Sequence, residues 1–151
     1  MRNTCRPVID GFRIPSGPTS SLTLRQRMNI TATGTGIVLF AHGSRDPAWR
    51  LPLQAIAEQV QIQHGSPCRL AFLEFMQPDL PAALAELAAA GCQSLRVMPL
   101  FWAAGKHVTR DLTAMVDSFA AKHRELQLSV AKPLGDDAAV QAVIAHWAVR
   151  A

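Results

Sequence analysis

The chain has 151 residues, of which 49% are hydrophobic and 17% charged, a composition typical of a soluble globular protein with one core. No hydrophobic segment approaches the ~20 residues that a membrane-spanning helix needs, so we expect no membrane partner. The formal net charge of +4 comes from residues 1–27, which hold five arginines against Asp10, while the ten basic and ten acidic residues that follow cancel, so we expect no nucleic-acid partner.

The first 34 residues form a basic leader rich in Ser, Thr, Pro and Arg, which we expect to be disordered. The leader lacks the apolar segment of a secretory signal, so we expect a cytoplasmic protein. Either the leader is a disordered or transit-like extension, or translation begins at Met28, and we favour the second interpretation. Residues 35–151 are expected to form a single domain. The cysteines have no C-x-x-C spacing and are predicted to be reduced, buried thiols: Cys5, Cys68 and Cys92.

From Gly36 onward, short apolar runs alternate with longer segments of helical period, which is typical of an α/β fold with a parallel sheet. Strands are predicted at residues 37–40, 69–75, 94–101 and 126–131. Helical spacing of apolar residues predicts four helices, marked by Trp49, Leu53, Ile56 and Val60, by Leu80, Leu84 and Leu87, by Val108, Leu112, Met115 and Phe119, and by Val140, Ile144 and Trp147. Because crossovers are right-handed, we predict a doubly wound four-stranded parallel sheet of flavodoxin-like order 2-1-3-4, with helices on both faces.

This order brings three chemically active side chains to the carboxyl edge of the sheet. His42 ends the first strand, Glu74 lies at the end of the second, and His107 follows the third. Neighbouring strands are about 4.8 Å apart, so the three side chains are expected to converge. Imidazole nitrogen and carboxylate oxygen suit divalent first-row metals, and no thiolate accompanies them, which favours an open, exchangeable metal site over a closed zinc site.

Each of these residues also has a structural interpretation. His42 could hydrogen-bond a backbone carbonyl or cap the next helix, and His107 could be an ordinary residue of a helix start. Glu74 is harder to explain in this way, because an acid within an apolar strand would be buried and unpaired unless the strand ends there or a cation binds it.

Polar, cationic and aromatic residues lie close to these three in the sequence. The turn after His42 offers backbone donors at a helix start, so an anionic ligand is favoured there, although a solvated helix end explains the cations nearly as well. Phe101 and Trp102 could offer aromatic surface to a large flat molecule, with core packing as the alternative that we favour for Phe101. The candidate substrate-binding residues are Ser44, Arg45, Lys106 and Arg110.

Three stretches carry a family resemblance: FAHGSRDP, AFLEFMQPDLPAAL and RVMPLFWAAGKHVTRDL. In order and spacing they resemble the small single-domain sirohydrochlorin chelatases of the class II chelatase superfamily, over about residues 36–135. The resemblance implies insertion of Co²⁺ or Fe²⁺ into sirohydrochlorin, on the way to cobalamin or sirohaem, without ATP and without an organic cofactor. Longer members contain two such halves, so the short form is expected to pair as a homodimer.

Position by position, the resemblance makes His42 and His107 the metal-handling histidines and Glu74 the active-site acid. Lys106 stands where the family often has a small residue or Arg, and we expect it to reach a substrate carboxylate. A histidine phosphatase also uses a His-Gly pair after its first strand but needs an arginine directly before the histidine, where this chain has Ala41. A non-catalytic metal- or tetrapyrrole-binding carrier of the same fold stays open as an alternative, because fold does not fix function.

Overall fold

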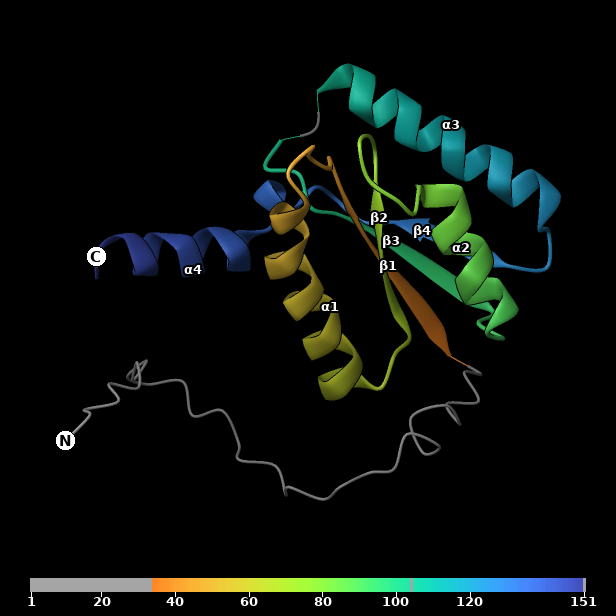
Figure 1. Ribbon diagram of the computed structural model, residues 1–151, viewed down its shortest axis with the longest axis horizontal. Helices are drawn as coiled ribbons and strands as arrows, with labels where there is room; N and C mark the ends of the chain where they lie inside the picture. Colours follow the sequence, from red (N-terminus) through yellow and green to blue (C-terminus); the bar gives the residue numbers. More distant parts are fainter. Residues whose placement is uncertain (1–33, 104, 151) are drawn as a thin grey trace.

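The computed structural model describes residues 34–103 and 105–150, which form one parallel sheet flanked by helices (Figure 1). The strands are β1 (Thr35–Ala41), β2 (Cys68–Phe72), β3 (Ser94–Pro99) and β4 (Gln127–Val130), arranged in the order β2-β1-β3-β4. The predicted order and parallel pairing are confirmed. Ile37 lies beside Cys68 of β2 on one side and beside Arg96 of β3 on the other, so β1 is an interior strand with a neighbour along each edge.

Helices cover both faces of the sheet, as predicted. They are α1 (Arg50–His64), α2 (Leu80–Ala89), α3 (Lys106–Lys122) and α4 (Ala138–Ala148), with short 3₁₀ turns η2 (Pro47–Trp49) and η3 (Leu134–Asp136). Figure 1 shows α1 on one face and α2 and α3 on the other, whereas α4 extends away from the body of the protein. Local capping fixes several of these boundaries: the Asp79 carboxylate accepts a hydrogen bond from Ala82 N at 2.9 Å at the start of α2.

The two faces of the sheet are packed unequally. The larger core lies between the sheet and helices α2 and α3, and it includes Val38, Phe40, Leu84 and Val97. The core beneath α1 is much smaller and centres on Leu39, Ala57 and Cys68. One face of the sheet is therefore well covered, and the other is covered mainly over β1 and β2.

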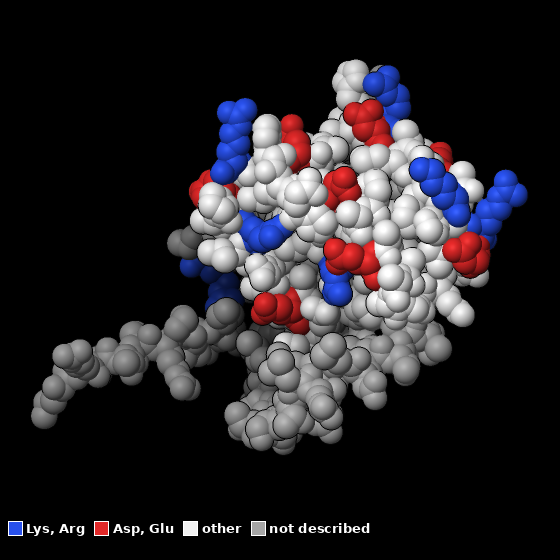
Figure 2. All heavy atoms as spheres, turned by 45° about the vertical axis from the view of Figure 1, so that its right-hand side comes forward, with Lys and Arg blue, Asp and Glu red and all other residues white. Residues whose placement is uncertain are grey.

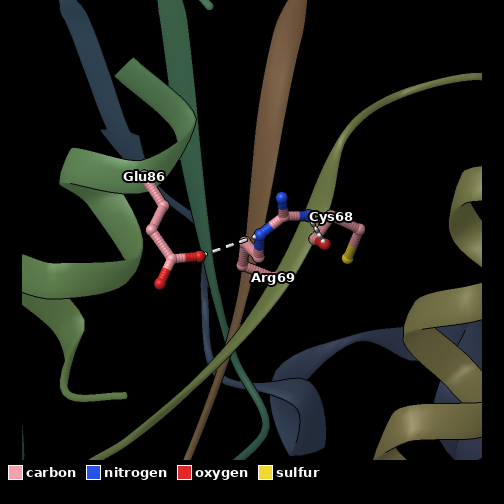
Figure 3. A network of polar contacts seen from close by, with 3 residues as sticks. All are labelled: Cys68, Arg69 and Glu86. Carbon is pink, nitrogen blue, oxygen red and sulfur yellow. Dashed lines mark hydrogen bonds and ion pairs between the residues drawn. The ribbon is translucent and has the colours of Figure 1, made fainter. Parts of the chain in front are cut away.

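Neighbouring residues of β2 point to opposite faces, as Figure 3 shows for Cys68 and Arg69. Cys68 and Cys92 are free and buried, as predicted, and burial raises the pKa of the Cys68 thiol to about 11, which makes it unreactive at neutral pH. Cys5 lies outside the described residues.

Arg69 Nε lies 3.0 Å from Glu86 Oε2 of α2, but both side chains are substantially exposed, so this ion pair contributes little to stability.

Two predictions from the sequence are corrected. The second strand ends at Phe72, not at residue 75, because the chain turns back at this point and Phe72 N donates to the carbonyl of Pro78 at 3.0 Å. Glu74 is therefore exposed in a loop and is not buried in a strand. The third strand likewise ends at Pro99, two residues earlier than predicted, because the chain leaves the sheet toward α3.

Among the described residues, none of the helices has the length and apolar character needed to cross a membrane. On the face drawn in Figure 2, basic and acidic side chains are interspersed over the surface. This mixture agrees with the balance of charges after residue 27.

Replacing Leu84 by alanine tests the larger core. Leu84 is fully buried on α2, so Leu84→Ala removes buried apolar atoms and leaves a cavity. We expect a loss of about 2–5 kcal/mol in the free energy of unfolding, measured by denaturant titration. The matched control is Leu51→Ala at an exposed leucine of α1, for which the change should stay within about 0.5 kcal/mol. Equal effects of the two substitutions would contradict the assigned core.

Candidate functional site at the carboxyl edge of the sheet

The hydrogen bonds of the sheet continue past the ends of β1, β2 and β3. Leu73 N donates to the carbonyl of Ala41 at 2.9 Å, and Glu74 N donates to the carbonyl of His42 at 2.9 Å. On the other side of β1, Leu100 N donates to the carbonyl of Phe40 at 2.7 Å. The backbones of His42 and Glu74 are therefore paired at the carboxyl edge, and both side chains are exposed there.

Gly43 allows this close pairing. Its φ of +93° belongs to a region that side-chain-bearing residues rarely adopt. A Cβ atom at this position would also overlap the carbonyl oxygen of Glu74. The glycine after His42 therefore has a structural reason: it lets the loop after β1 lie directly against the loop after β2.

The His42 ring packs against the apolar ring of Phe101. Its centroid lies 4.5 Å from that of Phe101, with the ring planes at 53°. Phe101 is only 2% exposed and contacts the Phe40 ring edge-on at 5.5 Å, so it belongs to the core, as favoured from the sequence. The next residue, Trp102, is 58% exposed and presents aromatic surface in the loop that follows β3. The His42 side chain thus packs against the core on one side and is exposed to solvent on the other.

The loop after β2 contains a feature that sequence analysis did not single out. Phe75 is 58% exposed and has a φ of +63°, although it is not a glycine. The Arg45 guanidinium lies 5.0 Å from the centre of its ring, within the range of a cation–π interaction. Residues held in such uncommon backbone conformations cluster at functional sites, so Phe75 is a candidate for the site. The sequence did not reveal this feature of Phe75, because the residue continues the apolar strand pattern of the run LAFLEF.

The same loop is fixed at both ends. Arg50, at the start of α1, donates to the carbonyl of Gln77, and its guanidinium lies 5.0 Å from the centre of the Phe72 ring. The Gln77–Pro78 peptide is cis. Asp79 then caps α2. Glu74 and Phe75 therefore lie in a loop anchored to α1 on one side and to α2 on the other.

His107 lies in the first turn of α3, directly after the loop that follows β3, and its side chain is exposed. Arg110 lies one turn further along α3 and is also exposed. Its Nε atom lies 3.6 Å from Oδ1 of Asp111, in an ion pair at the surface. The side chain of Lys106 lies outside the described part of the structure. Ser44 Oγ accepts a hydrogen bond from Asp46 N at 3.1 Å, so this hydroxyl has at least a turn-forming role.

The edge is open and does not form a preformed metal cage. Within residues 34–103 and 105–150, no group of three or more His, Cys, Asp or Glu side chains could hold a metal ion. Four cavities of about 290 to 440 Å³ are lined by other residues, and none of the four includes His42, Glu74 or His107. The three candidate residues thus lie on an accessible surface at one end of the sheet.

Comparisons with known proteins place this geometry in context. The CbiX family model matches residues 36–151. The sirohydrochlorin cobaltochelatase of Saccharolobus solfataricus is 34% identical over 115 residues, which cover 72% of this chain and 89% of that protein. The crystal structure of a CbiX protein from Marinobacter aquaeolei has a TM-score of 0.68 and 27% identity, covering 78% of this chain and 93% of that one. The sirohydrochlorin chelatase SirB from Bacillus subtilis subspecies spizizenii, solved in complex with cobalt, has a TM-score of 0.65 and 22% identity, and the match covers 74% of this chain and 48% of that chain.

Replacing Gly43 by alanine tests the contact between the two loops. Gly43→Ala forces a side chain into a positive-φ position and against the Glu74 carbonyl, so we expect a loss of about 1–3 kcal/mol in the free energy of unfolding. The control is Gly105→Ala, because Gly105 has a φ of −61° and open space around its Cβ position. Chemical denaturation of both variants should show a loss for the first alone. An unchanged Gly43→Ala protein would mean that the loops are not in contact.

Proposed function

The chain belongs to the CbiX family, and on this premise we propose that it inserts a divalent metal ion, Co²⁺ or Fe²⁺, into sirohydrochlorin during cobalamin or sirohaem synthesis. The observation that carries the proposal is the backbone pairing of His42 with Glu74, which holds an imidazole and a carboxylate on an open edge of the sheet. His107, at the start of α3, completes the proposed set. The enzyme is a metal chelatase, for which both the metal ion and the tetrapyrrole are substrates.

The reaction makes two chemical demands on these residues. A metal ion must leave water and reach four ring nitrogens, and two pyrrole protons must leave the macrocycle as the metal enters. A neutral imidazole can bind the metal or accept a proton, and a carboxylate can do either. We assign His42 and His107 to presenting the metal at one face of the macrocycle, with Glu74 assisting as a ligand or a proton acceptor.

The exposed position of the candidate ligands suits a metal ion that is bound briefly and then passed to the macrocycle. A closed set of three or four protein ligands is typical of tightly held structural metals. The described residues contain no such cage, and the exposed imidazole of His42 and carboxylate of Glu74 are available for exchange. A weakly held ion can transfer to the macrocycle, whose four nitrogens form the stronger site.

The surroundings of the edge suit a flat molecule with peripheral carboxylates. Arg45 and Phe75 place a positive charge and an aromatic ring within 5.0 Å of each other, and Trp102 exposes further aromatic surface. We assign Arg45, Lys106 and Arg110 to binding substrate carboxylates, with Ser44 and its turn beside them. Guanidinium groups suit this role because they can bind a carboxylate through two hydrogen bonds.

We further propose that two copies of the chain complete the substrate cleft. One copy offers an open edge, and it matches 48% of the SirB chain, so a single copy corresponds to about half of that longer protein. Residues 35–151 form the working domain in this proposal. The cytoplasmic location expected from the sequence stays a prediction.

Replacing either histidine by alanine tests the proposed roles. His42→Ala and His107→Ala should each lower the rate of Co²⁺ or Fe²⁺ insertion by roughly 10²-fold or more, because each removes a metal-binding or proton-accepting group. The rate is followed by the visible spectrum of sirohydrochlorin, after subtraction of spontaneous insertion. The control is His123→Ala at the far end of α3, which should keep its activity. Thermal unfolding should change little in His42→Ala and His107→Ala, because both side chains are exposed.

The same assay separates an enzyme from a carrier. A wild-type protein that binds sirohydrochlorin and metal without accelerating insertion above the background would be a carrier, and the proposed activity would be wrong. Full activity of His42→Ala or of His107→Ala would remove that residue from the site.

A further inference from the structure

Two phenylalanines near the end of β2 each lie beside an arginine that follows β1 in the chain. The Arg50 guanidinium lies 5.0 Å from the centre of the Phe72 ring, and the Arg45 guanidinium lies 5.0 Å from the centre of the Phe75 ring. Both distances are within the range of a cation–π interaction. The two pairs are alike in this contact, and they differ in what else each arginine binds.

Arg50 serves the fold. Its guanidinium also donates to the carbonyl of Gln77, and the Phe72 ring beside it is only 1% exposed. The arginine thus joins the start of α1 to the loop after β2 through both an aromatic and a polar contact. These contacts account for Arg50 as a structural residue.

Arg45 has the aromatic contact alone. It belongs to none of the three ion pairs found within residues 34–103 and 105–150, and its guanidinium makes no hydrogen bond to those residues. The neighbouring Asp46 carboxylate accepts instead from Ala48 N at 2.9 Å. A cation–π contact uses the charge of a guanidinium and not its N–H donors. The exposed donors of Arg45 are therefore available to an anionic ligand.

The Phe75 ring is exposed because the backbone turns sharply at this residue. Met76 N donates to the carbonyl of Glu74 at 2.8 Å, and Phe75 between them has a φ of +63°. These features are typical of the rare, strained form of the γ-turn. In a continued strand Phe75 would share the face of Leu73, which packs against the larger core, but 58% of its side chain is exposed instead. A strained residue that exposes an apolar ring points to a function for that ring.

The Arg45–Phe75 contact links two loops beside the candidate catalytic residues. Arg45 lies three positions after His42, and Phe75 directly follows Glu74. The backbones of His42 and Glu74 are themselves hydrogen-bonded, so the side-chain contact adds a second link between the same loops. A long, exposed arginine side chain otherwise samples several rotamers, and ordering it costs conformational entropy. The Phe75 ring favours the rotamers that keep the guanidinium at the carboxyl edge.

We propose that Phe75 is a positioning residue for Arg45, and that its ring holds the guanidinium where it binds a peripheral carboxylate of the tetrapyrrole. This inference rests on the proposed function and adds to it a residue without a polar side chain. Because the guanidinium is already ordered when the substrate arrives, less entropy is lost on binding. The pair acts on substrate binding and takes no part in the chemical step.

Steady-state kinetics with sirohydrochlorin and Co²⁺ test this role. Phe75→Leu keeps a side chain at the same positive φ and removes the aromatic face. It should raise KM for sirohydrochlorin about two- to fivefold, the equivalent of an exposed cation–π contact, with kcat unchanged. Phe75→Tyr keeps the ring and should retain the wild-type KM. Arg45→Gln should raise KM about tenfold or more, because it removes hydrogen bonds between charged groups.

The matched control for loss of an arginine is Arg124→Gln. Arg124 is exposed and follows the far end of α3, so this substitution should leave KM unchanged. A wild-type KM in Phe75→Leu, or a change confined to kcat, would overturn the positioning role.

The double variant separates positioning from direct stacking of the ring on the macrocycle. Because Phe75 acts through Arg45, Phe75→Leu should raise KM no further in a protein that already carries Arg45→Gln. A ring that stacks on the macrocycle would instead raise KM by the same factor with or without Arg45. That second result would contradict the proposal.

Nuclear magnetic resonance detects the contact in the absence of substrate. The Arg45 Nε–H signal, identified by its loss in Arg45→Gln, should be shifted upfield by the ring current of Phe75 in the wild type. In Phe75→Leu the signal should move to the position of a solvated arginine. An identical signal in the two proteins would mean that the ring does not hold the guanidinium.

Binding of metal-free sirohydrochlorin distinguishes failure of this inference from failure of the proposed function. Absorbance titration of the same variants should reproduce the pattern seen in KM, and it requires no metal insertion. A wild-type protein that binds sirohydrochlorin without accelerating insertion would refute the proposed activity, while the titration still decides the role of Phe75. A wild-type protein that does not bind sirohydrochlorin would overturn both.

Discussion

The candidate site depends on the hydrogen bonds that β1 makes on both of its edges. The carbonyls of Phe40, Ala41 and His42 accept from the chains that leave β3 and β2, so three loops emerge from the sheet in a fixed register. A slip of one residue would turn His42 and the buried Phe40 to the opposite face. The paired backbone therefore sets the position of the chemically active side chains, which make few contacts of their own.

Most of the fold could be predicted because a parallel sheet covered by helices imposes a simple pattern. The run IVLF is apolar at each position since both of its faces are covered, and the handedness of the crossovers leaves few possible strand orders. The second strand was predicted too long because Leu73 and Phe75 are apolar for another reason. Leu73 packs beside the larger core, and Phe75 is exposed beside Arg45. Hydropathy alone does not distinguish these situations from a strand.

The candidate site was only partly predictable for a similar reason. Strand order places His42, Glu74 and His107 at one edge, and this requires no knowledge of the loops. The positive φ of Phe75 and the contact of His42 with Phe101 depend on loop conformations that short sequence patterns do not specify. The last helix, α4, was predicted correctly from the spacing of its apolar residues, but this periodicity indicates only that a helix has an apolar face. It does not indicate which surface that face covers.

The length of β1 also has a practical consequence for handling the protein. The strand has seven residues and so spans about 23 Å, and it enters the sheet at the edge opposite His42. A purification tag fused ahead of Thr35 would thus begin a full sheet length from the imidazole. A tag fused after residue 151 would instead follow α4 within three residues. Fusion directly ahead of Thr35 is accordingly the safer point of attachment for immobilising this domain.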